Sequence, residues 1–258
     1  MTDPFPSEED APVPAEPVGN LPIPNTHPDG GPRSIVFVNE KPGTAKSTSA
    51  VLTALALHED GQDVVLIDGD VNGKSVMGWH NAIGGFPFRV FQMPSVTLHQ
   101  DIPKTFADPK TRIVIDAPPL ENQPGIARSA MRYADLSVIP VAPSSMETER
   151  MGDIRDEIND LGPLTLNGIC ARVLLNRCIP QAKRHNRLYR NILVSGGWNV
   201  FDTAIPMVTE FQGAWGKTIE AGGGEYDQLL VELGIRQTRD DTYDELVSYL
   251  TKARENNA

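Results

Sequence analysis

The stretch IVFVNEKPGTAKSTSA, residues 35–50, decides the fold of this chain. Its first four residues, 35–38, are apolar and mostly β-branched, which predicts a strand buried on both faces. A tight loop follows, and Lys46 and Ser47 then open a segment, 46–58, that has the pattern of a helix. In this arrangement the N–H groups of the loop and of the helix N-terminus face an anion. The stretch therefore predicts a phosphate-binding loop in an α/β domain.

The alternation of strand and helix continues along the chain. Further apolar runs lie at 64–67, 113–115, 136–141 and 172–175, and helix candidates lie between or after them at 123–133, 146–160 and 181–194. Such alternation implies βαβ crossovers, and so a mainly parallel, twisted, Rossmann-like sheet with helices on both faces. Because ligands bind at the carboxyl ends of the strands in these sheets, the residues that directly follow each run are the candidate site.

Charged and hydroxyl side chains occur at those strand ends. Lys46 offers a positive charge to the β- and γ-phosphates of a nucleotide, and Ser47 offers a hydroxyl to Mg²⁺. Asp116 follows the run 113–115 and suits a carboxylate that holds a Mg²⁺-bound water. Asp68 and Asp70 follow the run 64–67, so one can serve the metal shell while the other orients an attacking water. We expect Ser47, Asp68 and Asp116 to form the metal site.

Six short motifs resemble those of one family. KPGTAKST (41–48) resembles the deviant Walker A box of the ParA/MinD ATPases, LIDGD (66–70) resembles their A′ motif, and IVIDAPP (113–119) resembles their Walker B motif. YADLSVIPVAP (133–143), VLLNR (173–177) and VFDTAIP (200–206) are similar to later strands of the family. The resemblance covers about residues 33–235 and implies a P-loop NTPase fold with ATP and Mg²⁺ as ligands.

The resemblance also implies roles for individual residues. It implies that Lys41 crosses a dimer interface to the partner's ATP, that Asp70 positions the hydrolytic water, and that Asn176 and Pro206 lie at the adenine base. Lys41, Lys46 and Asp70 are then the expected catalytic residues. The expected nucleotide-binding residues are Lys41, Pro42, Gly43, Thr44, Ala45, Lys46, Ser47, Thr48, Asn176 and Pro206.

Two positions of the loop depart from the family pattern. Pro42 replaces a glycine and removes one N–H donor from the cradle. Ala45 replaces another glycine, and is strained if that position needs a positive φ. These departures leave two functions open: an ATPase, or a nucleotide-binding switch or interaction protein with little or no hydrolysis.

Charge is distributed unevenly along the chain. The net charge is −11, which by itself argues against a nucleic-acid partner. Residues 161–201, however, contain no acidic residue and six basic ones: Arg172, Arg177, Lys183, Arg184, Arg187 and Arg190. Four of them, Lys183, Arg184, Arg187 and Arg190, lie in one predicted helix and are the candidate DNA-binding residues. The alternative interpretation is an ordinary solvated helix face.

The two ends of the chain differ from its centre in composition and pattern. Residues 1–32 are acidic and rich in proline, which predicts a disordered tail before a single ATPase domain at 33–258. Residues 240–257 have the pattern of an amphipathic helix, but their acidic residues favour packing over membrane binding. Cys170 and Cys178 lie too far apart along an extended strand for a disulfide, in keeping with a reducing compartment.

Together these features predict a cytoplasmic, nucleoid-associated protein closest to the short ParA-type partition proteins. The expected function is that of an ATPase that dimerises on ATP and partitions or positions plasmid or chromosomal DNA, or another large cargo. The expected partners are a second copy of the chain, non-specific DNA and a ParB-like or other adaptor, with no membrane partner.

Overall fold

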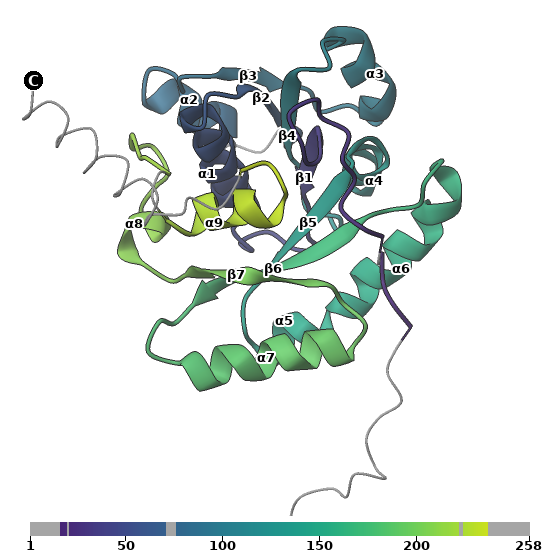
Figure 1. Cartoon of the computed structure of the whole chain (residues 1–258), viewed down its shortest axis with the longest axis vertical. Helices are drawn as coiled ribbons and strands as arrows, with labels where there is room; N and C mark the ends of the chain where they lie inside the picture. The colour runs from purple at the N-terminus through teal and green to yellow at the C-terminus, as the bar shows by residue number, and fades with distance from the viewer. Residues whose placement is uncertain (1–15, 20, 71–75, 222–223, 237–258) are drawn as a thin grey trace, which may run out of the picture.

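A twisted parallel sheet of seven strands forms the centre of the computed structural model, which describes residues 16–19, 21–70, 76–221 and 224–236 (Figure 1). The strands are β1 (Ser34–Phe37), β2 (Asp63–Asp68), β3 (Arg89–Gln92), β4 (Thr111–Asp116), β5 (Leu136–Val141), β6 (Ala171–Cys178) and β7 (Val200–Pro206). Their order across the sheet is β3-β2-β4-β1-β5-β6-β7, and every pair is parallel. The predicted fold class is confirmed.

The helices cover both faces of the sheet (Figure 1). They are α1 (Lys46–Glu59), α2 (Val76–Ala82), α3 (Leu98–Thr105), α4 (Pro124–Tyr133), α5 (Ser145–Glu149), α6 (Met151–Leu161), α7 (Lys183–Ser195), α8 (Thr209–Gln212) and α9 (Glu225–Glu232). A 3₁₀ turn, Gly162–Leu164, follows α6. The helix predicted over 146–160 is divided at Arg150 into α5 and α6.

Two apolar cores result, one on each face of the sheet. Successive residues of β1 point into different cores. Ile35 and Phe37 pack in the core that contains α1, α2 and α9, whereas Val36 packs in the core that contains α3, α4 and α6. Strands buried on both faces need apolar residues at successive positions, which is why the runs in the sequence were continuous rather than alternating. The edge strand β3 has the burial pattern exposed, intermediate, exposed, exposed and was not predicted.

The amino-terminal segment differs from the predicted tail in the part that the structure describes, 16–19 and 21–32. Val18 is buried, and its N–H donates to the carbonyl of Gly197 at 3.0 Å. The carbonyl of Gly19 accepts the N–H of Ala171 at 3.0 Å. These contacts come from Val18 and Gly19, so the prolines of the segment do not prevent it from packing on the domain. The packed part of the chain thus begins before the predicted boundary at residue 32.

Two predictions lie outside the described residues, namely the structure of residues 1–15 and the helix at 240–257. In the part of the chain that the structure does describe, no helix has the length and apolar character needed to cross a membrane. Cys170 and Cys178 are both free and buried, as expected, and burial raises the pKa of each thiol to about 11.

Candidate functional site

The loop between β1 and α1 is shaped as an anion cradle. The first hydrogen bond of α1 runs from the N–H of Ser49 to the carbonyl of Ala45 at 2.9 Å. The N–H groups of residues 46–48 therefore precede the ladder of the helix and point from its N-terminus without an intrahelical acceptor. Aligned peptide dipoles add partial positive charge at this end. The geometry suits phosphate oxygens, as predicted from the sequence.

The backbone of the loop is left-handed at two positions. Gly43 has φ +77° and a Cβ there would meet nothing within 4 Å. Ala45, at the N-cap of α1, has φ +66° and ψ 25°. A left-handed conformation costs a residue with a Cβ roughly 1–2 kcal/mol. The strain that the sequence predicted for Ala45 is therefore present in the structure.

Lys46 lies inside this loop rather than in solvent. Its side chain is almost fully buried, and Nζ donates to the carbonyl of Lys41 at 2.8 Å. Burial lowers the pKa of the ammonium, while Asp116 and Asp70 act in the opposite direction. A phosphate brought into the cradle would supply the negative charge that this buried ammonium favours.

Asp116 is a buried carboxylate at the end of β4. Among the described residues neither of its oxygens has a hydrogen-bond partner within normal geometry. Burial raises the pKa of Asp116 to about 7; the Ser47 hydroxyl and Lys46 lower it, whereas Asp68 and Asp70 raise it further. A buried carboxylate without a partner is unfavourable unless a cation or water joins it.

These residues fit a magnesium ion bound together with a nucleotide. Mg²⁺ binds through one or two carboxylates and the phosphates and keeps several waters, so a dense protein cage is not required. In keeping with this, no group of three His, Cys, Asp or Glu side chains in the described ranges is arranged to hold a metal by itself. Ser47 and Asp116 lie at the phosphate loop as expected.

Asp68 and Asp70 occupy different positions at the end of β2. Asp68 is fully buried, and its two oxygens accept the N–H groups of Asp70 at 3.0 Å and Met77 at 2.8 Å. The structure thus gives Asp68 a second task that the sequence did not predict, that of holding the chain on either side of residues 71–75. Asp70 is partly exposed, and its carboxylate accepts a hydrogen bond from Gln123 Nε2 at 3.3 Å.

Asn176 and Pro206 come together with the phosphate loop around one cavity of about 490 Å³. Gly43, Ala45 and Thr48 form its loop side, and the two expected residues line it from the ends of β6 and β7. A second hollow of about 220 Å³ shares the same three loop residues and contains Lys46, Ser47 and Asp70. The two hollows adjoin across the loop, as the base and phosphate parts of one nucleotide require.

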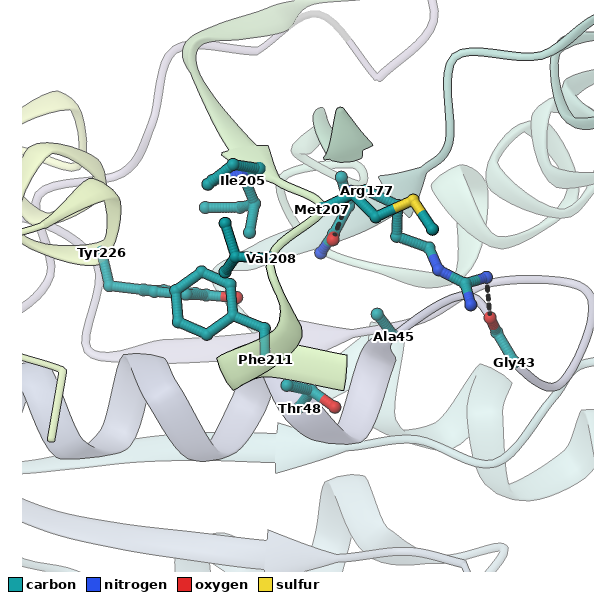
Figure 2. A pocket seen from close by; sticks show the side chains of 11 residues that line it. Gly43, Ala45, Thr48, Arg177, Ile205, Met207, Val208, Phe211 and Tyr226 are labelled. Carbon is teal, nitrogen blue, oxygen red and sulfur yellow. Dashed lines mark hydrogen bonds between the residues drawn. The ribbon is translucent and has the colours of Figure 1, made fainter. Parts of the chain in front are cut away.

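Several residues of the larger cavity were missing from the sequence prediction (Figure 2). They are Arg177, Ile205, Met207, Val208, Phe211 and Tyr226. Phe211 and Tyr226 lie with their rings 5.9 Å apart in an edge-on arrangement and form an apolar, aromatic wall. An aromatic wall of this kind suits a flat base. Their positions in the sequence carry no signal of this role because α8 and α9 are short helices far along the chain.

A buried hydrogen-bonded chain supports the cavity from below. Tyr226 Oη donates to Ser49 Oγ at 3.2 Å, and Asn176 Nδ2 donates to the same oxygen at 2.9 Å. Asn176 Oδ1 in turn accepts the N–H of Arg177 at 2.7 Å. The amide of Asn176 is therefore held in one orientation by α1 and by its own strand.

Lys41 is placed unlike Lys46. Its side chain is 38% exposed, and Nζ lies 3.8 Å from Glu121 Oε2, which is itself partly exposed. A pair this open to water contributes little stability. The side chain of Lys41 therefore stands at the surface of the phosphate loop, where little holds it in place.

The basic residues of 161–201 do not form one surface. Arg172 is partly buried in β6, and Arg177 lines the cavity. Arg190 is half-buried and pairs with Asp202, so it differs from the expected free phosphate ligand. Three exposed basic residues remain on α7: Lys183, Arg184 and Arg187. The acid-free stretch stood out in the sequence, but the acid that pairs with Arg190 lies just beyond its end.

Comparison with known proteins agrees with this geometry. A family model described as ATPase MipZ matches residues 33–83. The structure resembles a putative plasmid partition protein from Borrelia burgdorferi B31 bound to AMPPNP, with TM-score 0.59, 15% identity, and coverage of 79% of this chain and 98% of that one. It resembles the MinD cell division protein of Aquifex aeolicus with TM-score 0.58, 17% identity, and coverage of 77% and 97%.

A third similar structure is that of a protein named as a synthase. Cobyrinic acid a,c-diamide synthase from Mycobacterium smegmatis, with bound ADP and magnesium, has TM-score 0.57, 17% identity, and coverage of 71% of this chain and 90% of that one. No curated protein sequence matches the chain. At these identities the solved structures establish the fold and leave the activity to be argued from the site.

The strand order and the phosphate loop define the P-loop NTPase fold, with a parallel sheet. The family model over residues 33–83, which span β1, α1, β2 and α2, agrees with the resemblance of the sequence to the ParA/MinD family, and the solved structures agree with the fold of that family. The site residues fit ATP and Mg²⁺ as ligands, which are the ligands, or analogues of them, named for the similar structures.

Proposed function

We propose that this protein is a Mg²⁺-dependent ATPase that acts as a nucleotide-switched dimer to position a large cargo. One observation carries the proposal: a buried, unpartnered Asp116 and a buried Lys46 meet at a helix N-terminus beside an aromatic-lined cavity. This combination of cation, carboxylate and helix terminus matches the opposite charges of a metal-bound triphosphate. The similar partition and cell-division proteins support the positioning role.

The chain's own groups divide the chemistry between them. Lys46 exchanges its hydrogen bond to the Lys41 carbonyl for phosphate oxygens, and the N–H groups of 46–48 bind the same chain of phosphates. Ser47 and Asp116 would hold Mg²⁺, which when bound neutralises charge on the phosphates. Asp70, held by Gln123, accepts a hydrogen bond from the attacking water and orients it.

Dimerisation in this proposal depends on Lys41. Lys46 already serves the phosphates within one subunit, whereas Lys41 is partly exposed and weakly paired, so it is available to a nucleotide on a second copy. Lys41→Ala is expected to leave ATP binding by the monomer within about twofold and to lower the ATP-dependent dimer fraction. Sedimentation with equal dimer fractions for variant and wild type would contradict this role.

DNA binding in this proposal rests on Lys183, Arg184 and Arg187 of α7. Three contacts give weak, salt-dependent binding, with log affinity falling by about 0.9 per contact as log salt rises. A dimer joins two such surfaces, so ATP binding would strengthen DNA binding through avidity. The contacts are expected with phosphates rather than bases.

The central test is ATP binding and turnover by three proteins. Wild type is expected to bind ATP·Mg²⁺ and release phosphate, Lys46→Ala to lose at least about 100-fold in affinity, and Asp70→Ala to bind normally and hydrolyse at least about tenfold more slowly. Thermal unfolding checks that both variants fold. Unchanged affinity of Lys46→Ala removes the nucleotide-binding assignment. ATP binding by wild type without turnover, even with DNA and an adaptor present, favours the non-hydrolysing switch.

The DNA surface is tested with matched charge reversals. Lys183, Arg184 and Arg187 are changed together to Glu. A control changes three basic residues away from α7 by the same total charge: Arg89 of β3, Lys104 of α3 and Lys110, which precedes β4. The α7 variant is expected to lose ATP-dependent binding to random-sequence duplex in a salt titration and to keep its dimerisation. Equal losses in both variants would show a net-charge effect and remove α7 from the proposal.

A further inference from the structure

The phosphate loop lacks a donor where Pro42 stands. Backbone N–H groups of such a loop bind phosphate oxygens, and proline has none. Pro42 lines the smaller hollow together with Lys46 and Ser47, so the missing donor concerns the ligand directly. A loop that keeps a proline there needs its donor from elsewhere in the fold, or binds its anion less tightly.

Arg177 reaches the same point of the loop from β6 (Figure 2). Its Nη1 donates to the carbonyl of Gly43, the residue after Pro42, at 2.9 Å. Arginine carries five N–H donors. This is the one hydrogen bond that its guanidinium makes with the described parts of the chain, so four donors remain. Arg177 lines the larger cavity, and three loop residues of that cavity, Gly43, Ala45 and Thr48, also line the phosphate hollow that contains Pro42.

The backbone of Arg177 is left-handed and lies at an irregularity in the pairing of β6 with β7. Arg177 has φ +57°, and besides Ala45 it is the other described non-glycine residue with a positive φ. The pairing of β6 with β7 shifts register between Leu175 and Cys178, as at a β-bulge. Bulges next to sites re-aim a side chain, and strained backbone of this kind persists only where surrounding contacts hold it. Asn176 Oδ1, which accepts the Arg177 N–H at 2.7 Å, is such a contact.

We propose that the Arg177 guanidinium binds the phosphate chain of the nucleotide at the point where Pro42 supplies no N–H group. Arg177 is then a nucleotide-binding residue, anchored by one N–H to Gly43 while the others face the ligand. This inference rests on the proposed nucleotide binding and adds a residue to that site. A charged hydrogen bond to phosphate is stronger than the backbone donor it replaces, because the donor carries a full charge.

The test is a double-mutant cycle in ATP·Mg²⁺ affinity, measured by calorimetry. Arg177→Ala is expected to weaken binding by about tenfold or more. Pro42→Gly restores an N–H to the loop, so the same Arg177→Ala change in that background is expected to cost only about threefold or less. If Arg177 merely braced the loop, the more flexible Pro42→Gly loop would depend on it more. An equal or larger loss in the Pro42→Gly background overturns the inference.

Arg177→Gly separates binding from folding. Glycine fits a φ of +57° without strain, so this variant is expected to unfold at or above the wild-type temperature and still lose about tenfold in ATP affinity. Arg89→Ala, which removes an exposed arginine on β3, serves as the control with unchanged affinity. Wild-type affinity in Arg177→Ala or Arg177→Gly removes the inference alone, whereas a wild type that binds no ATP removes the proposed function with it.

Discussion

Polar groups are paired differently at the two ends of the parallel strands, which we call the amino edge, where the strands begin, and the carboxyl edge, where they end. At the amino edge, where β1, β4 and β5 begin, Arg112 is buried and donates to the carbonyls of Pro32 and Gly30 at 2.8 Å each and to Gln62 Oε1 at 3.0 Å. Asp135 on the same edge accepts three hydrogen bonds at 2.8 Å. At the carboxyl edge Asp116 is buried with neither oxygen paired, and Ala45 is left-handed.

This difference separates well-paired polar groups from the residues of the proposed nucleotide site within one sheet. The amino edge is sealed by the amino-terminal segment, whose carbonyls satisfy a charge that would otherwise be costly to bury. The carboxyl edge keeps a buried charge and strained backbone, which persist only because the surrounding fold holds them. We expect substitutions at the amino edge to lower the free energy of unfolding and to leave nucleotide affinity unchanged. Substitutions at the carboxyl edge are expected to lower nucleotide affinity, and to leave the free energy of unfolding unchanged or raise it.

The largest expected effect is at the amino edge. Arg112→Ala removes three hydrogen bonds and leaves the carbonyls of Gly30 and Pro32 without their donor. It is expected to lower the free energy of unfolding by about 3–5 kcal/mol in urea titrations, with unchanged ATP affinity in the folded protein. Arg89→Ala, which breaks the exposed pair with Asp63, is the control at about 0–1 kcal/mol. Equal effects of the two variants would refute the difference between the buried, hydrogen-bonded Arg112 and the exposed Arg89.

Asp116 provides the next effect, which depends on pH. Its pKa rises from 3.8 to about 7 in the folded state, so the folded protein binds this proton more tightly than the unfolded chain does. Stability from this group is full below pH 4 and is lost as the pH rises through 7, with an upper bound of about 4 kcal/mol at 1.36 kcal/mol per pKa unit.

Asp116→Asn cannot ionise and removes this loss. Without nucleotide or Mg²⁺, the variant is expected to be more stable than wild type at pH 8 by about 2 kcal/mol and to differ little at or below about pH 4. Urea unfolding across this range is the measurement. A variant that is less stable than wild type at pH 8 would show that the carboxylate is satisfied in the free protein and that the carboxyl edge carries no such penalty.

The smallest effect concerns the left-handed Ala45. Ala45→Gly relieves a strain of roughly 1–2 kcal/mol, partly offset by the greater freedom of glycine in the unfolded chain, so a gain of about 0.5 kcal/mol is expected. Ala50→Gly, within α1, is the matched control and is expected to destabilise by about 1 kcal/mol or more. Thermal unfolding in which both changes destabilise alike would contradict the strain at Ala45.

Much of the fold was predictable because its signals are local. Continuous apolar runs predicted β1, β2, β4, β5 and β6, since strands covered on both faces need such residues. Elements with weaker local signals were missed: β3 is an exposed edge strand, and α3 carries Pro103 inside it. A helix of eight residues with an internal proline does not stand out by periodicity.

The candidate site divides in the same way. The sequence by itself determined the phosphate loop and the carboxylates Asp68, Asp70 and Asp116, because a parallel sheet collects its strand ends at one edge. Only the tertiary structure decided that Phe211 and Tyr226 form the cavity wall and that Arg177 reaches Gly43. Only it showed that Arg190 pairs with Asp202 and that residues near Val18 pack on the domain.

The physical reason is the range of the interactions. The periodicity of a strand or helix, and a loop of eight residues, depend only on residues close together in the sequence. One stretch of chain is therefore enough to recognise them. The contact of Arg177 with Gly43 joins residues 134 positions apart, and that of Tyr226 with Ser49 joins residues 177 apart. Such contacts depend on strand order, on a register shift and on one left-handed residue, which arise only once the whole sheet is assembled.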